Sequence, residues 1–473
     1  MKLPEKTLKK KHTAQRLAAL VHHPHAETAV FLAMLLVFTA CVGYFAFHLH
    51  KALVPDEPGY IYISTLFAQT WKVPSPTEYS LALGFSRFER LPFLYFWING
   101  RVLNLLTWVA PQISDWHQIL GLRVVNGLYS ILSILFTWLL AREVINKPWW
   151  RLLPVFMMTS TLMYAFLSAG VSYDNLANLG AVGGIYFLVR VLKGRPLITN
   201  SLLWIFFIAV GTMAKKTILP VALVTFLIWL VYLIWKRKEI NFKEKLSARL
   251  VLVAIPTLLI IALNLVVYGV NLVRYLEPIP DCRDLMTDAQ CSLSVYERRA
   301  IDMGFPEEKL TLRDVIQQQK TNPLNYFDEY WINRMLKTVY GIMGHQSYYP
   351  TLITAFYRLL YLFLLVIAFK YWQKSDFAFI SLIIIALSYI AVIFLQSYNE
   401  ELMSDFQHVA IQGRYHFPIL ASFYVMVTEF MSRITAGWLR KLTLAYTVTL
   451  FTVGGPVLFL LYFAAAKGLN WFS

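Results

Sequence analysis

The sequence predicts an all-α polytopic membrane protein with about 11 transmembrane helices, within a range of 10–13. The first observation is composition: 58% of the 473 residues are hydrophobic and only 15% are charged, whereas about a quarter of an ordinary soluble domain is charged. The second is that the apolar residues gather in long runs, and about 20 apolar residues span the hydrocarbon core of a bilayer. The third is that short basic segments separate these runs at alternate ends, as is typical of cytoplasmic loops.

The N-terminal part of the chain begins with a basic tail, 1–27, which we expect in the cytoplasm. The first apolar run continues past Cys41, so we expect a retained helix rather than a cleaved signal. The pair Lys215-Lys216 interrupts what would otherwise be one apolar hairpin. The spans predicted in this part are about 28–48, 119–141, 152–169, 175–192, 201–214, 217–235 and 250–269.

The C-terminal part follows a long polar loop, 271–350. The spans predicted there are about 351–371, 376–396, 415–432 and 443–464. The sequence therefore organises into the cytoplasmic tail, one transmembrane domain over 28–464 and a short C-terminal tail over 465–473.

The positive-inside rule orients these spans. With the N-terminus inside, the basic loops fall in the cytoplasm, whereas 51–118 and 271–350 become extracytoplasmic loops that belong to the transmembrane domain. The stretch 91–110 is apolar but carries Asn99 and Arg101, so we expect an interfacial helix there. We expect an integral membrane protein of the bacterial inner (plasma) membrane.

The net charge of +16 fits cytoplasmic loops that face anionic membrane lipids, not a nucleic-acid partner. No Walker loop, dinucleotide fingerprint or nucleophile elbow is present. Cys282 and Cys291 share the long polar loop. They form a disulfide if that loop lies outside, and are two free thiols if it faces a reducing compartment.

The acids with functional interest fall on the outer face. Asp56 and Glu57 follow the first span directly, and adjacent acids at a membrane surface are costly unless solvated or paired. Asp174 lies at the outer end of the third span. The alternative is structural: Asp56 caps the helix that starts at Pro58, and Asp174 caps the fourth span.

The basic residues predicted on that face are Lys215, Lys216 and Arg414. Lysine binds phosphate as a point charge, and arginine binds it through the paired N–H donors of its planar guanidinium group. Their structural alternatives are snorkelling of the lysines to the interface and an interfacial pairing of Arg414 with Glu400, Glu401 or Asp405. Other side chains expected at a shared outer cavity are Tyr60, Tyr173, His345, His408, Gln412 and Tyr415.

The chain resembles the GT-C superfamily of membrane glycosyltransferases in the order of several short motifs. They are Pro55-Asp56-Glu57, Leu122-Arg123-Val124-Val125-Asn126-Gly127, Tyr173-Asp174-Asn175-Leu176-Ala177, Gly211-Thr212-Met213-Ala214-Lys215 and Arg414-Tyr415-His416-Phe417-Pro418. It is most similar to an uncharacterised bacterial family of membrane proteins with a Gln-Gly-Arg-Tyr motif, here at Gln412, and a Gly-x-x-Gly stretch, here Gly341 to Gly344. Related proteins often have a His near the acidic pair, where this chain has Tyr60.

The resemblance implies a GT-C-like fold and an enzyme that transfers a hexose or pentose from a polyprenyl-phosphate donor to a glycan, lipid or protein acceptor. It implies an inverting single displacement on the extracytoplasmic face. Asp56 would be the base, Glu57 would orient it or bind sugar, and Asp174 would hold the acceptor or the sugar. Lys215, Lys216 and Arg414 would bind the leaving phosphate.

Two alternatives stay open at this stage. One is a transporter or flippase of lipid-linked or envelope precursors, for which mid-span charges and paired repeats are typical. The other is a non-catalytic membrane protein of envelope assembly. No spacing of His, Cys, Asp and Glu indicates a metal site, so no cofactor is assigned, although the departure at Tyr60 leaves a divalent-metal requirement open.

Overall fold

The computed structural model describes residues 25–239, 247–294, 298, 322–372, 376–403, 411–463 and 471–472. Within these ranges, nine helices are long and apolar enough to cross a membrane, or ten if one bent pair counts as a span. The regular structure of the described residues is helical throughout, with only isolated β-bridges besides. The predicted all-α class is confirmed, and the chain is an integral membrane protein.

The long helices agree closely with the predicted spans. Their outer surfaces carry exposed leucines, valines and phenylalanines, as a lipid-facing surface requires. They are α2 (Ala26–His48), α6 (Asp115–Val144), α9 (Tyr173–Leu192), α10 (Leu197–Ala214), α11 (Leu219–Lys236), α12 (Ala248–Asn264) continued by η4 (Leu265–Gly269) and α13 (Val270–Tyr275), α20 (Thr351–Lys370), α21 (Phe377–Met403), and α23 (Gly437–Val453) continued by α24 (Pro456–Leu458) and η7 (Phe459–Phe463).

Two predicted spans differ from straight, full-length helices. The span predicted over 152–169 is broken into α7 (Leu152–Thr159) and α8 (Leu162–Ser168), which meet at 66°. At the break the Thr161 backbone is extended (ψ 110°), and its hydroxyl bonds to the hydroxyl of Tyr424, a distant residue, at 2.7 Å. The span predicted over 415–432 contains α22 (Phe417–Ser432), a helix of 16 residues preceded by η6 (Gly413–His416).

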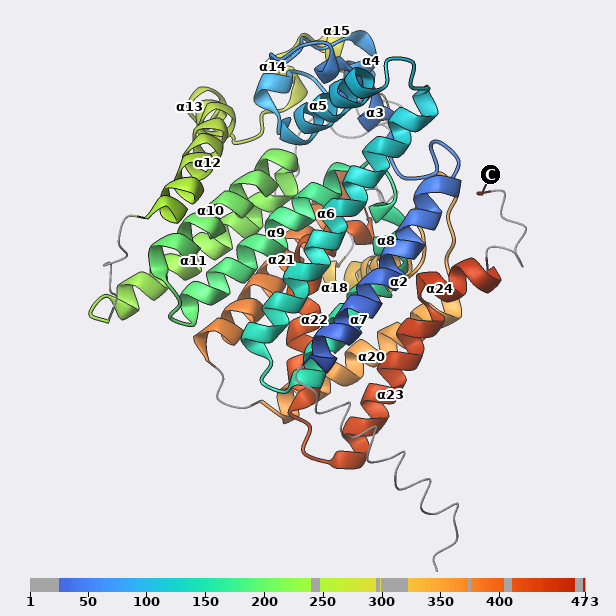
Figure 1. Cartoon of the computed structure of the whole chain (residues 1–473), viewed down its shortest axis with the longest axis vertical. Helices are drawn as coiled ribbons and strands as arrows, with labels where there is room; N and C mark the ends of the chain where they lie inside the picture. The colour runs from blue at the N-terminus through green and yellow to red at the C-terminus, as the bar shows by residue number, and fades with distance from the viewer. Residues whose placement is uncertain are drawn as a thin grey trace, which may run out of the picture.

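Short helices from the predicted outer loop 51–118 and from the first part of the loop 271–350 gather at one end of the bundle (Figure 1). Asn271 joins the loops: its Nδ2 donates to the Arg90 carbonyl at 2.9 Å and to the Pro278 carbonyl at 3.1 Å. The interfacial helix expected over 91–110 is α5 (Leu94–Val109). The other members are α3 (Glu57–Ala68), α4 (Glu78–Ala82), η1 (Phe88–Arg90), α14 (Cys282–Leu285) and α15 (Asp288–Cys291).

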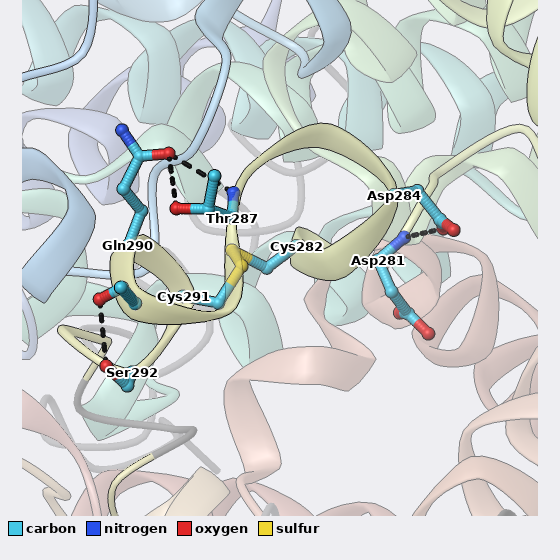
Figure 2. The surroundings of a disulfide bond; sticks show 8 residues. Asp281, Cys282, Asp284, Thr287, Gln290, Cys291 and Ser292 are labelled. Carbon is cyan, nitrogen blue, oxygen red and sulfur yellow. Dashed lines mark hydrogen bonds between the residues drawn. A yellow bond between two sulfur atoms is a disulfide. The ribbon is translucent and has the colours of Figure 1, made fainter.

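The group of short helices at this end is called the end cap below. A disulfide joins Cys282 to Cys291 in it, with their Cα atoms 5.8 Å apart (Figure 2). Each of the two short helices also has a capping box. Asp281 N–H donates to Asp284 at 2.9 Å, and Thr287 N–H donates to Gln290 at 3.2 Å. The disulfide and the two boxes together hold a segment too short to form a hydrophobic core of its own.

The first and the last described residues lie toward opposite ends of the bundle. Helix α2 begins at the end away from the cap (Figure 1). The predicted N-terminal tail lies outside the described residues except for residues 25–27. In the predicted C-terminal tail, the carbonyl of Trp471 accepts from His50 N–H at 3.0 Å, beside the cap.

Helix α9 is the central span and packs against α10 through glycine. A Cβ atom on Gly180 would lie 2.5 Å from the Gly211 Cα atom and 2.7 Å from the Phe207 carbonyl oxygen. Glycine at 180 therefore lets the two backbones touch, as small residues do in membrane helix pairs. Ser172 caps the N-terminus of α9, and Gly194 ends it in the left-handed conformation (φ 73°). These signals fix where α9 begins and ends along the chain.

Candidate active site

Asp56 occupies the N-cap position of α3, but its side chain makes no capping hydrogen bond. Its backbone is left-handed (φ 61°), a conformation that aspartate tolerates better than most residues and that is frequent at functional sites. The carboxylate turns toward η6 and accepts from Arg414 Nη2 at 2.7 Å and from the Tyr60 hydroxyl at 3.4 Å. The Asp56 side chain is 45% exposed, so one face remains open. The structural alternative of a simple helix cap is therefore excluded.

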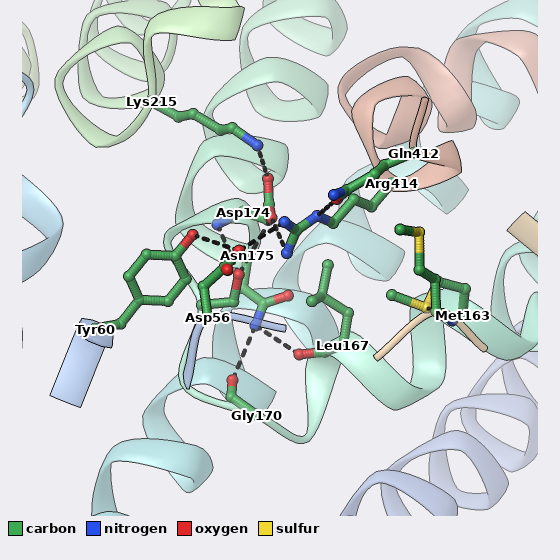
Figure 3. Close-up of polar contacts among 12 residues, drawn as sticks. Asp56, Tyr60, Met163, Leu167, Gly170, Asp174, Asn175, Lys215, Gln412 and Arg414 are labelled. Carbon is green, nitrogen blue, oxygen red and sulfur yellow. Dashed lines mark hydrogen bonds and ion pairs between the residues drawn. The ribbon is translucent and has the colours of Figure 1, made fainter. Parts of the chain in front are cut away.

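Arg414 is buried and held from several sides (Figure 3). The preceding Gly413 packs against the backbone of α19 (Ile332–Tyr340), where a Cβ atom would lie 2.6 Å from Val339 N, and its N–H donates to the Thr338 hydroxyl at 2.6 Å. Arg414 Nε donates to Gln412 Oε1 at 2.6 Å. The glycine and glutamine of the Gln-Gly-Arg-Tyr motif thus position the arginine.

Asp174 and Lys215 form a buried ion pair beside Arg414. Ser172, not Asp174, caps α9, because its hydroxyl oxygen accepts from Asp174 N–H at 3.3 Å. The Asp174 carboxylate instead accepts from Lys215 Nζ and lies 3.8 Å from Arg414 Nη1. Lys215 lies between α10 and η3 (Lys216–Ile218).

Aromatic rings enclose the Lys215 ammonium group. Its Nζ is 4.8 Å from the centre of the Tyr173 ring and 5.0 Å from that of Tyr415, distances typical of cation–π contacts. The Tyr173 ring packs edge-on against Tyr60 at 4.6 Å. The four charged groups Asp56, Asp174, Lys215 and Arg414 are called the charged cluster below.

Three other predicted site residues lie apart from the charged cluster or outside the described residues. Lys216 is exposed although its neighbour Lys215 is buried. His345 is exposed. Its backbone N–H donates at 3.3 Å to the carbonyl of Leu53, which lies three residues before Asp56. His408 lies outside the described residues. The Gly-x-x-Gly stretch explains the position of His345, since a Cβ atom on Gly344 would lie 2.4 Å from the Leu53 carbonyl oxygen.

Glu57 points away from the charged cluster. Its carboxylate is fully buried and pairs with Arg123, whose Nε and Nη2 donate at 2.8 and 2.7 Å. It also accepts from Val171 N–H at 3.0 Å. Arg123 in turn donates to the carbonyls of Ala46 and Leu49, both at 2.9 Å. Of the two roles expected for Glu57, direct sugar binding does not fit this burial, whereas orienting Asp56 through the backbone does.

Asn126 supports the site, a role that the sequence analysis did not assign although the residue lies in the Leu122–Gly127 motif. Its Oδ1 accepts from Ser172 N–H and from Asn175 Nδ2, both at 3.2 Å, and from the Tyr95 hydroxyl at 3.0 Å. It thereby holds the turn that leads into Asp174. A signal was present, because Arg123 and Asn126 are polar residues three apart inside an apolar span, where such residues are costly without partners.

The donor set does not fit a divalent metal. Among the described residues, no group of three or more His, Cys, Asp or Glu side chains lies close enough to hold an ion. Asp56 and Asp174 already have Arg414 and Lys215 as partners. Two fixed cations at this range oppose the entry of a divalent cation. We derive no step through a metal.

Comparisons with known proteins give matches in structure only. No family model matches the sequence, and no curated protein matches it. ArnT from Cupriavidus metallidurans bound to undecaprenyl phosphate has a TM-score of 0.47 and 14% identity, over 94% of this chain and 73% of that one. Apo ArnT from the same organism has a TM-score of 0.46 and 13% identity, over 88% and 61%.

A third solved structure is the archaeal oligosaccharyltransferase AglB from Archaeoglobus fulgidus, in complex with an inhibitory peptide and a dolichol-phosphate. It has a TM-score of 0.43 and 13% identity, and the match covers 89% of this chain and 55% of that one.

Proposed function

We propose that this protein is a membrane glycosyltransferase that moves a sugar from a polyprenyl-phosphate-linked donor to an acceptor on the extracytoplasmic face. The observation that carries the proposal is the convergence of the charged cluster from four separate segments at the cap end of the bundle. Buried charges in a membrane protein are costly and usually mark a functional site. The order of the motifs, which resembles that of the GT-C superfamily, supports the same conclusion.

Asp56 is the best base in this cluster because it is the one acid with an open face. Asp174 is buried against Lys215, and Glu57 is buried against Arg123. In the transfer step, an acceptor hydroxyl oxygen attacks the anomeric carbon. The bond from that carbon to the phosphate oxygen breaks, and its electron pair leaves with the lipid phosphate. The acceptor proton passes to Asp56, and the configuration at the anomeric carbon inverts.

Arg414 and Lys215 would stabilise the negative charge that develops on the leaving phosphate. Within the part of the chain that the structure describes, Arg414 Nη1 has no hydrogen-bond partner although it is buried. A buried guanidinium donor without an acceptor is unfavourable, so a phosphate oxygen would complete it. Exposed Lys216 would attract the lipid phosphate at the rim, a separate role from that of Lys215.

The remaining contacts assign positioning roles. Asp174 would hold hydroxyls of the sugar or acceptor only after exchanging its contact with Lys215, so we place it as a cluster-organising residue first. Tyr60, Tyr173 and Tyr415 would form an aromatic wall around the reacting centre. Gln412 would hold Arg414 in its orientation.

Substitution of Asp56 tests the proposal. In vesicles with a defined polyprenyl-phosphate sugar and acceptor, Asp56→Asn should lower the transfer rate by about 10²–10⁴-fold, the usual contribution of a general base. Glu78→Gln, at an exposed acid in the same outer loop, is the matched control and should keep the parent rate. Thermal unfolding of the purified variants shows whether each folds normally.

Transfer by a folded Asp56→Asn variant at the parent rate would contradict the base assignment. Carrier movement across the membrane without sugar transfer, by the parent protein, would favour a flippase. An assembly role would be favoured if every variant of the charged cluster kept both activities while disruption of the outer loops abolished function.

A further inference from the structure

A groove lies at the other end of α9, on the opposite side of the bundle from the charged cluster. It has a volume of about 290 Å³ and is lined by α6, α9 and α10. Its polar end is formed by Arg190 of α9, which lies 16 residues after Asp174, or about 24 Å along the helix. The groove therefore opens at the other membrane surface and takes no part in the proposed transfer.

The walls of the groove are mostly apolar, with Thr199 and Asn200 also in the lining. Phe136 and Leu139 of α6, Phe187 of α9 and Leu203 of α10 line it. The rings of Phe136 and Phe187 lie 5.9 Å apart. All but Phe187 are partly exposed. Such a surface, placed within three membrane-spanning helices, is suited to hydrocarbon rather than to a soluble ligand.

Arg190 supplies an anion-binding end to this groove. Its Nη1 donates to the Tyr186 hydroxyl at 3.3 Å, and its guanidinium group stacks 5.7 Å from the Tyr186 ring centre. Its Nε atom is buried and has no partner among the described residues. The neighbouring basic residues differ, since Lys193 pairs with Asp376 and Arg195 pairs with Glu143. No carboxylate within the described ranges pairs with Arg190, and unlike Arg142 it lies in the lining of the groove.

We propose that the groove binds an anionic phospholipid of the bilayer, with an acyl chain along Phe136, Phe187 and Leu203 and the phosphate at Arg190. Charge complementarity favours this occupant, because a phosphate oxygen would complete the buried Nε donor. Tyr186, at the boundary between apolar walls and the headgroup level, fits the interfacial position that tyrosine prefers. The site would hold one leaflet lipid as part of the folded protein.

Lipid retention by the purified full-length protein tests this proposal. The protein is mixed with phosphatidylglycerol or with zwitterionic phosphatidylcholine, and bound lipid is measured by native mass spectrometry. The parent should retain phosphatidylglycerol in preference. Arg190→Gln should weaken retention roughly five- to tenfold, as expected for loss of one basic contact at a membrane surface. Arg142→Gln, an exposed arginine that stacks on Trp138 at 4.9 Å, is the matched control and should not weaken it.

A second variant keeps the charge and fills the groove. Leu203→Trp should also reduce retention, because the larger ring would occupy the space of the acyl chain. Equal retention of the two lipids, or retention by Arg190→Gln at the parent level, would overturn the proposal. So would retention of undecaprenyl phosphate with exclusion of phosphatidylglycerol. Failure here leaves the proposed transfer reaction untouched, because its residues lie at the other end of α9.

Discussion

At the scale of single residues, adjacent charges in the sequence have separate structural roles. Lys215 is buried against Asp174, whereas Lys216 is exposed. Asp56 faces Arg414 and open space, whereas Glu57 is closed against Arg123. In both pairs the chain changes direction at the second residue, where a helix begins. A reversal of direction sends consecutive side chains to different surroundings.

Tyr60 provides a prediction at this scale. Burial raises the pKa of Tyr60 well above its usual range, with smaller contributions from Tyr173 and Asp56, so its hydroxyl stays protonated at neutral pH and donates to Asp56. Tyr60→Phe removes a donor that favours the charged carboxylate. We expect the variant to transfer sugar about threefold to tenfold more slowly, as for loss of one hydrogen bond to a charged group.

The transfer rate in vesicles is the measurement, and Tyr62→Phe is the control. Tyr62 lies on the same helix, but its hydroxyl bonds to Thr77 at 2.9 Å instead of to the charged cluster. Equal transfer rates for Tyr60→Phe and the parent would show that the Tyr60 hydroxyl does not act on the base.

At the scale of elements, the Glu57–Arg123 pair fastens the start of α3 to α6 and to the end of α2. Removing one partner of a buried pair leaves an uncompensated charge and costs about 3–5 kcal/mol. We therefore expect Arg123→Met to lower the thermal midpoint strongly, and Glu57→Leu combined with Arg123→Met to recover much of it. Thermal unfolding in detergent is the measurement.

The same variants separate positioning from chemistry. If Glu57 acts through the fold, the recovered double variant should regain sugar transfer together with stability. A double variant that is stable but inactive would point to a direct role of the Glu57 carboxylate at the reacting centre.

The contact between α9 and α10 gives a second prediction at the element scale, because these helices bring Asp174 and Lys215 together. Gly180→Ala should destabilise the protein by about 1–3 kcal/mol, the usual cost of overpacking, since the new Cβ would meet the backbone of Gly211. Gly43→Ala in α2 is the matched control: its Cβ would meet nothing within 4 Å. Equal thermal midpoints for the two variants would contradict the close backbone contact.

At the scale of the whole molecule, the disulfide allows a measurement of which side of the membrane the end cap faces. Cys41 is buried, and Cys282 and Cys291 lie in the cap that carries the proposed site. In intact cells or right-side-out vesicles, a membrane-impermeant thiol reagent should label the protein only after reduction. Labelling that requires permeabilised membranes would place the cap, and with it the charged cluster, in the cytoplasm.

Breaking the disulfide should have a local effect. Cys282→Ser with Cys291→Ser should lower the stability of the cap by about 2–3 kcal/mol in the chain-entropy estimate for so short a loop, while the spans remain folded. Limited proteolysis of the cap in the variant and the parent checks this, and equal cleavage rates would show that the capping boxes suffice.

The sequence by itself determined the helical class and the approximate position of every predicted span in the described residues. Hydropathy, caps and basic flanks are properties of neighbouring residues, so they can be read along the chain. Charge partners were decided only by the tertiary structure. Asp56 and Arg414 are separated by 358 positions, and no local pattern predicts which distant cation reaches which acid. The break at Thr161, the burial of Glu57 and the separation of Lys215 from Lys216 depend on the same long-range packing, because a charge in a membrane protein takes whichever partner the assembled helices bring to it.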